Sequence, residues 1–398
     1  MNVLLLTNYF PTPLNPMGGI FITRRLERLK KYGIDYDAFG AVYDESSLLG
    51  VARTVLKKPK KEGFDDLQYI EMGNVRYNYI HVPIGLPQAA FIRLSPFSEP
   101  LRAKYLFRST DSKKYDLIHA HCTYPEGTIA LLAKSRYGIP CVLSAHGSDI
   151  HTLPHIRPKL KPLILQTLES ADRVIFVSNA LLRKSMELGY DGENAVVIPN
   201  GVDTSLFSIM DKNEARRETG LSEVPTYCIG FVGNLVKVKG ADRLPEIFLN
   251  IKNEISDARF LVVGDGNLRQ SIQEKCSENG LEVLFTGIVN PDQVPLWMNS
   301  MNCLIIPSRN EGLPNVALEA QACGVPVVGS NVGGIPEAVG KGGKIVEEGE
   351  DFEERFAEAV CDILRNPPKP EKLRKRVSEY DWENIVRREV DVYRSLFS

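Results

Sequence analysis

The chain has 398 residues, of which 43% are hydrophobic and 25% charged, so its composition is globular and its length suits two domains of about 150 to 200 residues each. Its 48 basic and 50 acidic side chains give a formal net charge of -2. This balance excludes an overall basic surface for nucleic acid, and any basic site has to be local.

The seven cysteines are scattered along the chain and form no C-x-x-C pair. This pattern favours reduced core thiols over disulfides or a zinc site, and it predicts a cytoplasmic protein. The first apolar run is short and follows no basic residues, and no stretch approaches the roughly 20 apolar residues of a membrane span. We therefore expect neither a secretory signal nor a transmembrane helix.

Short runs rich in valine, isoleucine and leucine alternate with helical patterns in the first half of the chain. Four of these runs are apolar on both faces, which is typical of strands in a buried parallel sheet. They are VLLLT at 3–7, DLIHAH at 116–121, PCVLSAH at 140–146 and RVIFVS at 173–178.

The same alternation restarts after residue 226. The predicted order is a strand at 227–233, a helix at 241–255, a strand at 259–264, a helix at 267–280, a strand at 282–287, a helix at 292–301, a strand at 303–307, a helix at 314–323 and a strand at 325–330. This second βαβ series predicts an α/β protein with two doubly wound Rossmann-like domains that face each other across a cleft.

The polar segment 204–226, which Pro225 interrupts, is predicted to connect the two domains. The final segment, 381–398, reads as an amphipathic helix that packs back toward the first domain. Its apolar face would consist of Trp382, Ile385, Val386, Val390, Tyr393 and Leu396. The predicted boundaries are therefore 1–205, 206–380 and 381–398.

Two common phosphate-binding motifs do not fit this sequence. A dinucleotide fold requires G-x-G-x-x-G directly after its first strand, but the eleven residues NYFPTPLNPMG separate VLLLT from Gly19. The closest approach to a Walker loop, GIPEAVGKG at 334–342, has one residue too many and a glycine where the hydroxyl should be. The sequence therefore disfavours a dehydrogenase and a P-loop nucleotidase.

Three predicted helix starts are preceded by glycines. Proline at a first helical position leaves neighbouring N–H groups unpaired, and glycine lets a ligand approach the backbone. One such glycine usually serves only a tight turn, but three converging loops favour a site for an anion or for sugar hydroxyls. The glycines are Gly18 and Gly19, Gly312 before Pro314, and Gly333 and Gly334 before Pro336.

Two glutamates stand eight positions apart in the last of these regions. Glu311 lies in the loop before Pro314, and Glu319 lies about five residues into the predicted helix, roughly 7.5 Å of helix rise from its first turn. The helix is otherwise nearly uncharged, so Glu319 needs a polar partner unless it lies on a solvated face. We predict that the two acids hold different parts of one elongated ligand.

Two lysines, Lys237 and Lys239, follow the first strand of the second series and precede a helix. A cation at this place could meet a diphosphate. For either lysine alone, a solvated loop position explains the residue equally well.

Together these features resemble glycosyltransferase family 4, whose members are retaining, two-domain transferases of the GT-B type that use nucleotide sugars. The resemblance covers nearly the whole chain, and the E-x7-E stretch with GLPNVALEA and GGIPE is its most specific part. The other matching motifs are the Gly-Gly loop, HAH at 119–121, AHGSD at 145–149, VSNALL at 177–182, IPNGVD at 198–203, VGNLVKVKG at 232–240, VVGDG at 262–266, FTGIV at 285–289 and DWE at 381–383.

The resemblance implies roles for most of the candidate site residues. The residues expected to be catalytic are Glu311 at the transferred sugar, Lys239 at the diphosphate and His146 beside the sugar. Glu319 would hold the ribose hydroxyls. Gly19 would lie near the phosphate or acceptor, Ile288 near the base, and Gly312, Leu313, Pro314, Asn315 and Val316 around the sugar and phosphates. The other residues expected to bind substrate are Gly18, Asn234, Lys237, Gly266, His121 and Asp149.

The chain departs from the family pattern at one position. Most members have arginine where this chain has Asn234, so one of the two usual diphosphate cations is missing. Either Lys237 substitutes for it or Lys239 bears more of the charge. Some relatives that build surface polysaccharides also have asparagine here, so the change does not by itself imply an inactive enzyme.

Two possible metal sites are disfavoured. DYD at 35–37 matches the metal-binding D-x-D of the other large glycosyltransferase fold, but it falls in the predicted second strand. His119, His121 and His146 could bind zinc, but retaining transfer needs no activated water. We expect no cofactor and no essential metal.

The resulting prediction is a retaining hexosyltransferase of polysaccharide or glycolipid biosynthesis. It would bind a nucleoside diphosphate sugar, UDP-sugar before GDP-mannose, through the C-terminal domain, and a glycan or lipid-linked acceptor through the N-terminal domain. The alternatives are a noncatalytic nucleotide-sugar-binding regulator, which only Asn234 supports, and a phosphorylase or epimerase of the same fold.

The segment 46–61, SSLLGVARTVLKKPKK, has apolar residues at helical spacing and a basic end. A helix of this kind could rest on an anionic membrane, which would place the protein at the inner face of the membrane. The alternative is a surface helix that packs on its own domain.

Overall fold

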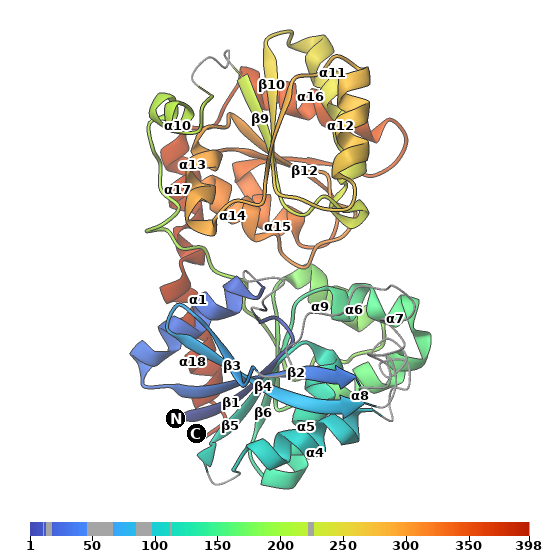
Figure 1. Ribbon diagram of the computed structural model, residues 1–398, viewed down its shortest axis with the longest axis vertical. Helices are drawn as coiled ribbons and strands as arrows, with labels where there is room; N and C mark the ends of the chain where they lie inside the picture. The colour runs from blue at the N-terminus through green and yellow to red at the C-terminus, as the bar shows by residue number, and fades with distance from the viewer. Residues whose placement is uncertain are drawn as a thin grey trace. The chain divides into compact units, whose positions relative to one another are not determined.

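The computed structural model describes residues 1–10, 12, 18–45, 67–84, 98–111, 114–221 and 227–397. They form two compact units, an N-terminal unit of residues 1–198 with 386–398 and a C-terminal unit of residues 199–385. Each unit is built on a mainly parallel sheet with helices, which confirms the predicted α/β class (Figure 1). The basic segment 46–61 lies outside the described residues.

The sheet of the N-terminal unit runs in the order β3-β4-β2-β1-β5-β6-β7-β8, and its described strands are parallel except for β3, which pairs antiparallel with β4. The four runs predicted as strands in this half are β1, β5, β6 and β7. The strands are β1 (Asn2–Thr7), β2 (Asp35–Glu45), β3 (Tyr69–Met72), β4 (Val75–Ile84), β5 (Leu117–His121), β6 (Cys141–Ala145), β7 (Arg173–Phe176) and β8 (Ala195–Val197).

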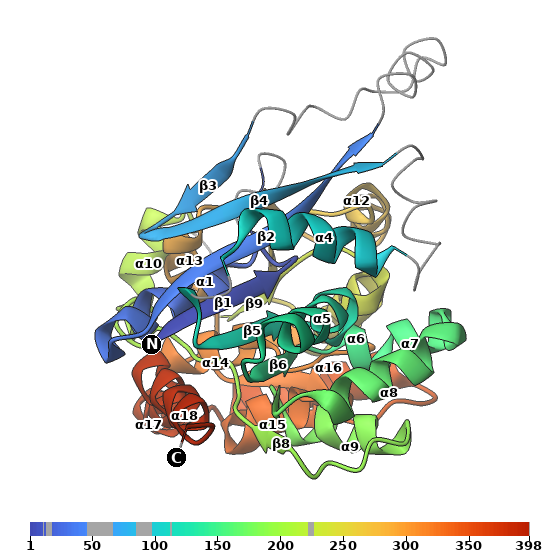
Figure 2. The ribbon, with the colours of Figure 1, turned by 90° about the horizontal axis from the view of Figure 1, so that it is seen from below.

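Helices cover this sheet, and α4 and α5 lie side by side against β4 and β5 (Figure 2). The apolar strands bury both faces, as the side chains of Leu4 and Ile118, which have no exposed surface, show. The helices are α1 (Ile20–Leu29), α4 (Glu99–Ser109), η3 (Thr123–Gly127), α5 (Thr128–Tyr137), α6 (Ser148–His151), α7 (Leu153–Ile156), α8 (Lys161–Ser170) and α9 (Asn179–Glu187).

The sheet of the C-terminal unit is parallel and runs in the order β11-β10-β9-β12-β13-β14. The chain leaves β9 toward β10 and later returns on the other side of β9, so the order of the strands reverses between β9 and β12. The strands are β9 (Tyr227–Val232), β10 (Ala258–Val263), β11 (Val283–Gly287), β12 (Cys303–Ile306), β13 (Val327–Ser330) and β14 (Gly343–Val346). This arrangement confirms the second βαβ series.

Aromatic stacking contributes to the core of this unit, where the rings of Phe248 and Phe260 lie 4.3 Å apart. All seven cysteines of the chain are buried and free, in agreement with their scattered positions. The helices are α10 (Lys212–Glu218), α11 (Leu244–Glu254), α12 (Arg269–Glu278), α13 (Val294–Asn299), α14 (Asn315–Ala322), α15 (Ile335–Val339), α16 (Phe352–Arg365) and α17 (Pro370–Val377).

The segment predicted as the connection between domains, 204–226, is instead part of the C-terminal unit, because the chain passes between units at residues 198–199 and 385–386. Helix α10 within this segment anchors itself through Arg216, whose guanidinium donates to the Ser300 carbonyl at 3.1 Å and to Asn302 Oδ1 at 2.7 Å. The prediction was wrong because the polar residues of an exposed helix face have the composition of a linker.

The last helix, α18 (Trp382–Arg394), begins in the C-terminal unit and continues in the N-terminal unit. Its predicted apolar face is confirmed, because Ile385, Val386, Val390 and Tyr393 have no exposed surface. Trp382 is 1% exposed and packs on Gly201, where an added Cβ would lie 2.4 Å from the indole.

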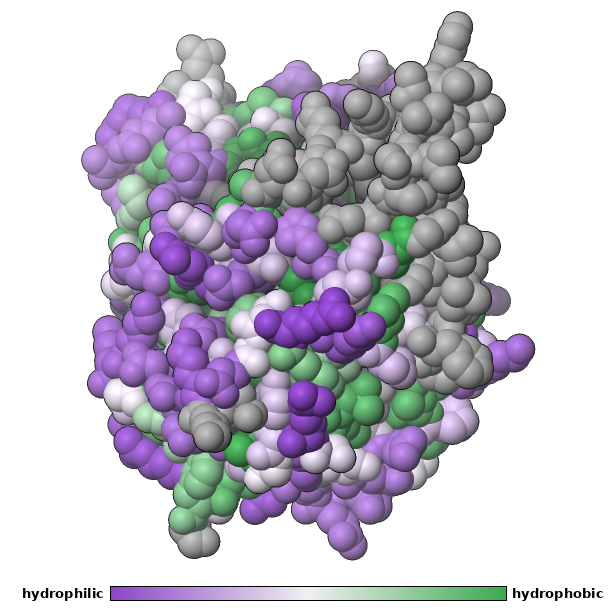
Figure 3. Space-filling view, turned by 60° about the horizontal axis from the view of Figure 1, so that its bottom comes forward, coloured by the Kyte–Doolittle hydropathy of each residue, from purple (hydrophilic) through white to green (hydrophobic). Residues whose placement is uncertain are grey.

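Hydrophilic residues and smaller hydrophobic patches are interspersed on the face shown in Figure 3. Within the part of the chain that the structure describes, no helix is long and apolar enough to cross a membrane.

Candidate active site

Lys239 and Glu311 meet at the point in the C-terminal unit where the strand order reverses. Lys239 ends the short helix η5 (Lys237–Lys239) after β9, and Glu311 follows β12. Lys239 Nζ lies 2.7 Å from Glu311 Oε1. Ligands of open α/β sheets bind outside the carboxyl ends of strands at such a point. The structure therefore brings together the cation and the acid that sequence reasoning placed in one site.

Close backbone contacts hold these loops. Gly240, with a φ of +68°, follows Lys239, and an added Cβ would lie 1.9 Å from the carbonyl oxygen of Pro307. Gly333, with a φ of +51°, packs equally tightly on the carbonyl oxygen of Glu311. Only glycine combines this backbone conformation with such proximity, so both glycines serve the mutual approach of the loops.

The carboxylate of Glu311 has a second partner that sequence reasoning missed. Ser308, which is 1% exposed, donates from Oγ to Glu311 Oε1 at 3.0 Å. The side chain of Glu311 is 10% exposed and that of Lys239 is 35% exposed. The acid is thus oriented by two groups while the ammonium retains a surface open to a ligand.

Arg309 was also missed, and it fixes the lysine loop. Its guanidinium donates to the Lys237 carbonyl at 2.8 Å and pairs with both carboxylate oxygens of Asp242 at 2.6 and 3.0 Å. Two parallel bonds of this kind set the geometry of both partners. A lone arginine in PSRNEG gives no motif from which this role could be recognised.

Helix α14 carries Glu319, as predicted, but its start needs one correction. Pro314 is the N-cap residue in an extended conformation, and the helix begins at Asn315 rather than at the proline. Glu319 is then the fifth helical residue and is half-buried between Leu318 and Ala320, which have no exposed surface. Gly312, Leu313 and Pro314 are buried, and Asn315 and Val316 half-buried, at the start of this helix.

The other predicted residues of this unit differ in exposure. Asn234 and Lys237 are exposed on the loop after β9. Gly266 follows β10 and packs on the Leu235 carbonyl, which an added Cβ would approach to 2.4 Å. Ile288, directly after β11, is 81% exposed.

A stack of three histidines lies at the ends of β5 and β6 in the N-terminal unit. The rings of His119 and His121 are 4.5 Å apart, and those of His121 and His146 are 5.1 Å apart. His121 Nδ1 and His146 Nε2 are 2.9 Å apart and share a hydrogen bond. Burial, together with the neighbouring Arg25 and His119, lowers the pKa of His146 to about 3. The His146 ring is therefore neutral at pH 7.

The histidines stack and bond one another. Among the described residues, no group of three or more histidine, cysteine, aspartate or glutamate side chains is arranged to hold a metal ion. The DYD motif lies at the start of β2, as predicted, where Asp37 accepts a hydrogen bond from the Tyr115 hydroxyl at 2.8 Å and pairs with Lys114 at 2.6 Å.

Helix α1 begins beside this stack. Gly19, with a φ of +70°, is its N-cap, and an added Cβ would lie 2.1 Å from the Tyr9 carbonyl oxygen. The ring of Phe21 is 5.1 Å from that of His146. The structure thus brings Gly19 and His146 to one end of the sheet, with the half-buried Gly18 next to them.

Asp149 acts on the backbone. Its carboxylate accepts hydrogen bonds from the N–H groups of Thr123 at 2.9 Å, Gly147 at 3.0 Å and His146 at 3.3 Å. Burial raises its pKa while these bonds oppose the rise. The bonds tie the loop after β5 to the loop after β6 and so position His146.

A buried ionic network supports the histidines from α18. Glu389 pairs with Arg25 of α1 at 3.1 Å, and neither side chain has exposed surface. The Tyr393 hydroxyl donates to Glu389 at 2.5 Å and lies 2.6 Å from His119 Nδ1. The His119 ring also meets Ser144 Oγ at 2.9 Å through Nε2. The network gives both ring nitrogens of His119 a fixed partner.

Comparison with known families covers both units. The family model described as Glycosyltransferase Family 4 matches residues 50–206, and the model described as Glycosyl transferases group 1 matches residues 226–366. The putative teichuronic acid biosynthesis glycosyltransferase of Bacillus subtilis is 25% identical over 100% of this chain and 94% of its own length. An uncharacterized glycosyltransferase of Methanocaldococcus jannaschii is 30% identical over 72% of this chain and 77% of its own.

Solved structures share the fold. Sucrose-phosphate synthase from Thermosynechococcus elongatus matches with a TM-score of 0.78 at 21% identity, over 100% of this chain and 99% of that one. Anabaena HepE in complex with UDP and glucose matches with a TM-score of 0.73 at 18% identity, over 99% of this chain and 100% of that one.

Proposed function

This chain belongs to glycosyltransferase family 4 and has the GT-B fold, and from that premise we propose that it is a retaining hexosyltransferase. Its donor is a nucleoside diphosphate sugar, with a UDP-sugar favoured and GDP-mannose next. Its acceptor is a glycan or a lipid-linked glycan in polysaccharide or glycolipid biosynthesis.

The observation that carries the proposal is the Lys239–Glu311 pair at the reversal of strand order. A partly exposed ammonium next to an oriented carboxylate suits a ligand that has a diphosphate beside a sugar. Lys239 meets the phosphates, Glu311 accepts hydrogen bonds from the sugar hydroxyls, and the N-terminal N–H groups of α14 face negative charge.

The rest of the donor follows from the neighbouring loops. Glu319 accepts hydrogen bonds from the ribose hydroxyls one helical turn beyond the start of α14. The exposed side chain of Ile288 contacts a face of the base. Anabaena HepE, which shares this fold, was solved in complex with UDP and glucose, and this supports UDP as the first nucleotide to test.

The difficult step is departure of the diphosphate while an oxocarbenium-like centre forms at the sugar. Lys239 stabilises the charge that develops on the leaving oxygen, which is preorganised electrostatic catalysis. The departing phosphate accepts the proton of the attacking acceptor hydroxyl as the new bond forms on the same face of the sugar. The chain's own residues supply this chemistry without an essential metal or another cofactor.

The acceptor binds in the N-terminal unit, where the neutral His146 ring offers hydrogen bonding without positive charge. The relative named for teichuronic acid biosynthesis supports a polysaccharide acceptor. We place the enzyme in the cytoplasm, with peripheral contact to the inner face of the membrane as the route to a lipid-linked acceptor.

The test is incubation of the full chain with UDP, GDP and ADP sugars, first alone and then with neutral glycoside acceptors. Free nucleoside diphosphate measures turnover, and the one-bond carbon–proton coupling constant at the new anomeric centre gives its configuration. We expect release from one donor and a product with the anomeric configuration of that donor. A product of inverted configuration contradicts retention, and binding of a nucleotide sugar without any release favours the noncatalytic alternative.

A further inference from the structure

The N-terminal unit contains a pocket of about 270 Å³ at the ends of β1, β5 and β6. Its wall includes Tyr9 after β1, Tyr124 and Glu126 of η3 after β5, and Ser148 of α6 after β6. The strand order reverses between β1 and β5, so the pocket has the usual position of a ligand site in an open α/β sheet.

One buried polar group in this pocket lacks a partner. Glu126 is 4% exposed, and its Oε2 has no hydrogen-bond partner among the described atoms. Asn8 bonds to the same carboxyl group, which fixes its orientation. A buried carboxyl oxygen without a partner is unfavourable, and a ligand hydroxyl would supply the missing donor.

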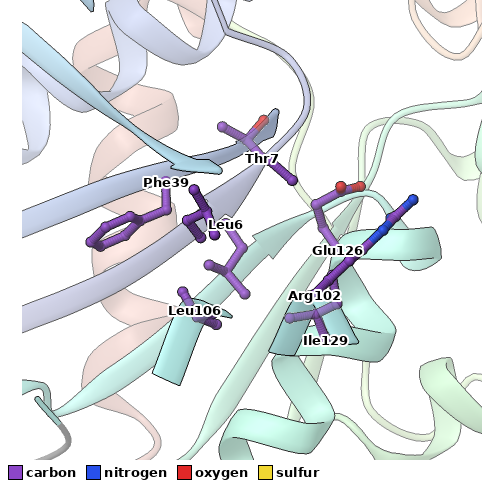
Figure 4. Close-up of a pocket in the computed structure, with 9 residues that line it drawn as sticks. Leu6, Thr7, Phe39, Arg102, Leu106, Glu126 and Ile129 are labelled. Carbon is purple, nitrogen blue, oxygen red and sulfur yellow. The ribbon is translucent and has the colours of Figure 1, made fainter. Parts of the chain in front are cut away.

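Apolar side chains surround the other side of Glu126. It also lines a cavity of about 20 Å³, at one end of which Glu126 and Arg102 lie side by side, while Leu6, Phe39 and Leu106 lie at the other (Figure 4). Burial raises the pKa of Glu126 to about 7, although Arg102 opposes the rise. Near neutral pH the carboxyl group can therefore either accept a hydrogen bond from a ligand hydroxyl or donate one to it.

The charges around the pocket are mostly negative. Its wall includes Glu126 and Asp149 but no lysine or arginine among the described residues that line it. The Tyr124 hydroxyl donates to a third buried acid, Glu99. Arg102 lines the small cavity behind Glu126 rather than the pocket itself. An anionic ligand group would meet buried carboxylates without a facing cation, whereas a neutral hydroxyl would meet acceptors.

Resting on the proposed function, we propose that this pocket binds the uncharged, hydroxyl-bearing sugar at the end of the acceptor. Glu126 is its specificity residue: it hydrogen bonds an acceptor hydroxyl and disfavours acceptors that carry phosphate or carboxylate at that position. Ile156 lies at the edge of the pocket and is 69% exposed. Its side chain is apolar, so its methyl signal can report that a sugar occupies the pocket without taking part in the polar contacts.

The binding test uses the full chain with isotope-labelled isoleucine methyl groups, in which Ile156→Val identifies the Ile156 signal. The probes are the methyl glycosides of glucose, galactose and mannose, and the corresponding hexose 6-phosphates. At pH 8, where Glu126 with its pKa of about 7 is mostly ionised, we expect at least one neutral glycoside to shift the Ile156 signal. The phosphates should bind about tenfold more weakly or worse, because one like charge has an effect of this size.

Two variants test the assigned residue. Glu126→Ala should weaken glycoside binding by about tenfold, since it removes a hydrogen bond to an ionisable group. Glu126→Gln retains the shape and the hydrogen bonding of the side chain but loses the charge. The ratio of glycoside affinity to phosphate affinity should therefore be about tenfold lower in this variant than in the wild type. Glu169→Gln, on the exposed surface of α8, is the matched control and should behave as the wild type.

These outcomes separate the pocket from the proposed reaction. If no donor is turned over but the Ile156 shift and the Glu126 effects are present, the transferase proposal fails and the pocket assignment stands. If no neutral glycoside moves the Ile156 signal, or if both Glu126 variants discriminate as the wild type does, the pocket assignment is overturned even in an active enzyme.

Discussion

Lys239 Nζ and Glu311 Oε1 lie 2.7 Å apart and join the loops that follow β9 and β12. Because the lysine side chain is 35% exposed, this pair contributes at most about 1 kcal/mol to stability. Folding alone therefore gives little reason for the pair, whereas a ligand with adjacent negative charge and hydroxyls would use both partners.

Glu311→Gln separates these explanations. The amide retains the shape of the side chain and a bond to Ser308 but loses the charge. We expect kcat/KM to fall by about 10²-fold or more, while the free energy of unfolding changes by less than about 1 kcal/mol. Steady-state kinetics and thermal unfolding measure the two quantities. Glu348→Gln, which removes the charge of a 38% exposed carboxylate that pairs with Arg243 in the same unit, is the control and should leave the kinetics unchanged.

Glu319→Gln tests the ribose assignment. A charge-assisted hydrogen bond contributes about 1.5 to 3 kcal/mol and is made in both the ground and transition states, so chiefly KM should rise. Calorimetric titration with the accepted nucleoside diphosphate should show affinity lower by roughly 10- to 100-fold. Unchanged nucleotide affinity in this variant shows that Glu319 does not hold the ribose.

Asn234→Arg tests the missing cation. Asn234 is exposed on the loop that leads to Lys239, so an arginine fits there without repacking of the core. In a Lys239→Ala background the arginine should raise kcat about tenfold over that of Lys239→Ala alone, because it resupplies positive charge near the diphosphate. Asn234→Gln is the neutral control and should restore nothing. Equal rates for the two double variants contradict the role assigned to this position.

Glu389→Gln tests the support of the histidine stack. Burial would raise the pKa of Glu389, but Arg25, His119 and Tyr393 together lower it to about 2 from the usual 4.5. A carboxyl group whose pKa is lower in the folded state stabilises the fold at any pH above its ordinary pKa of 4.5. This stabilisation is lost as the pH falls from about 4.5 to about 2. Wild-type stability should therefore decline across that window, and this contribution should be absent from the variant.

At neutral pH the same variant should be less stable by roughly 3 to 5 kcal/mol, because the buried Arg25 charge loses its carboxylate. Denaturant unfolding at a series of pH values measures both effects. The double variant Arg25→Met with Glu389→Gln should regain part of the loss, since no buried charge remains at that place. A single variant as stable as the wild type at pH 7 contradicts the importance of this ion pair.

Periodicity and local motifs predicted most of the strands and the main features of the C-terminal site, but they missed β3, β4, β8 and β14. Continuous apolar runs were sufficient to identify the predicted strands, because parallel strands are buried on both faces. The spacing of Glu311 and Glu319 placed one acid in a loop and the other on a helix, and the structure confirms both positions. The predicted roles of these residues remain predictions.

Pairs that are distant in the sequence were beyond such reasoning. Arg25 and Glu389 lie in the first and last long helices, and neither has a local pattern that marks it as buried. Glu126 likewise appears in the sequence as one acid after a proline. Its importance depends on a pocket formed by three separate loops. The start of α14 was misplaced by one residue because proline fits both the N-cap and the first helical position.

Lys239→Ala in the full enzyme with its accepted donor tests the central claim most directly. The charge on the leaving diphosphate grows as the sugar bond breaks, so the contribution of Lys239 is larger in the transition state than in the bound donor. Steady-state kinetics should show kcat lower by about 10²-fold or more. Lys237→Ala should be mild, because Lys237 is exposed and alanine keeps the carbonyl that accepts hydrogen bonds from Arg309 and from the Gly240 N–H. An unchanged kcat in Lys239→Ala, or a greater loss in Lys237→Ala, would contradict this account of leaving-group stabilisation.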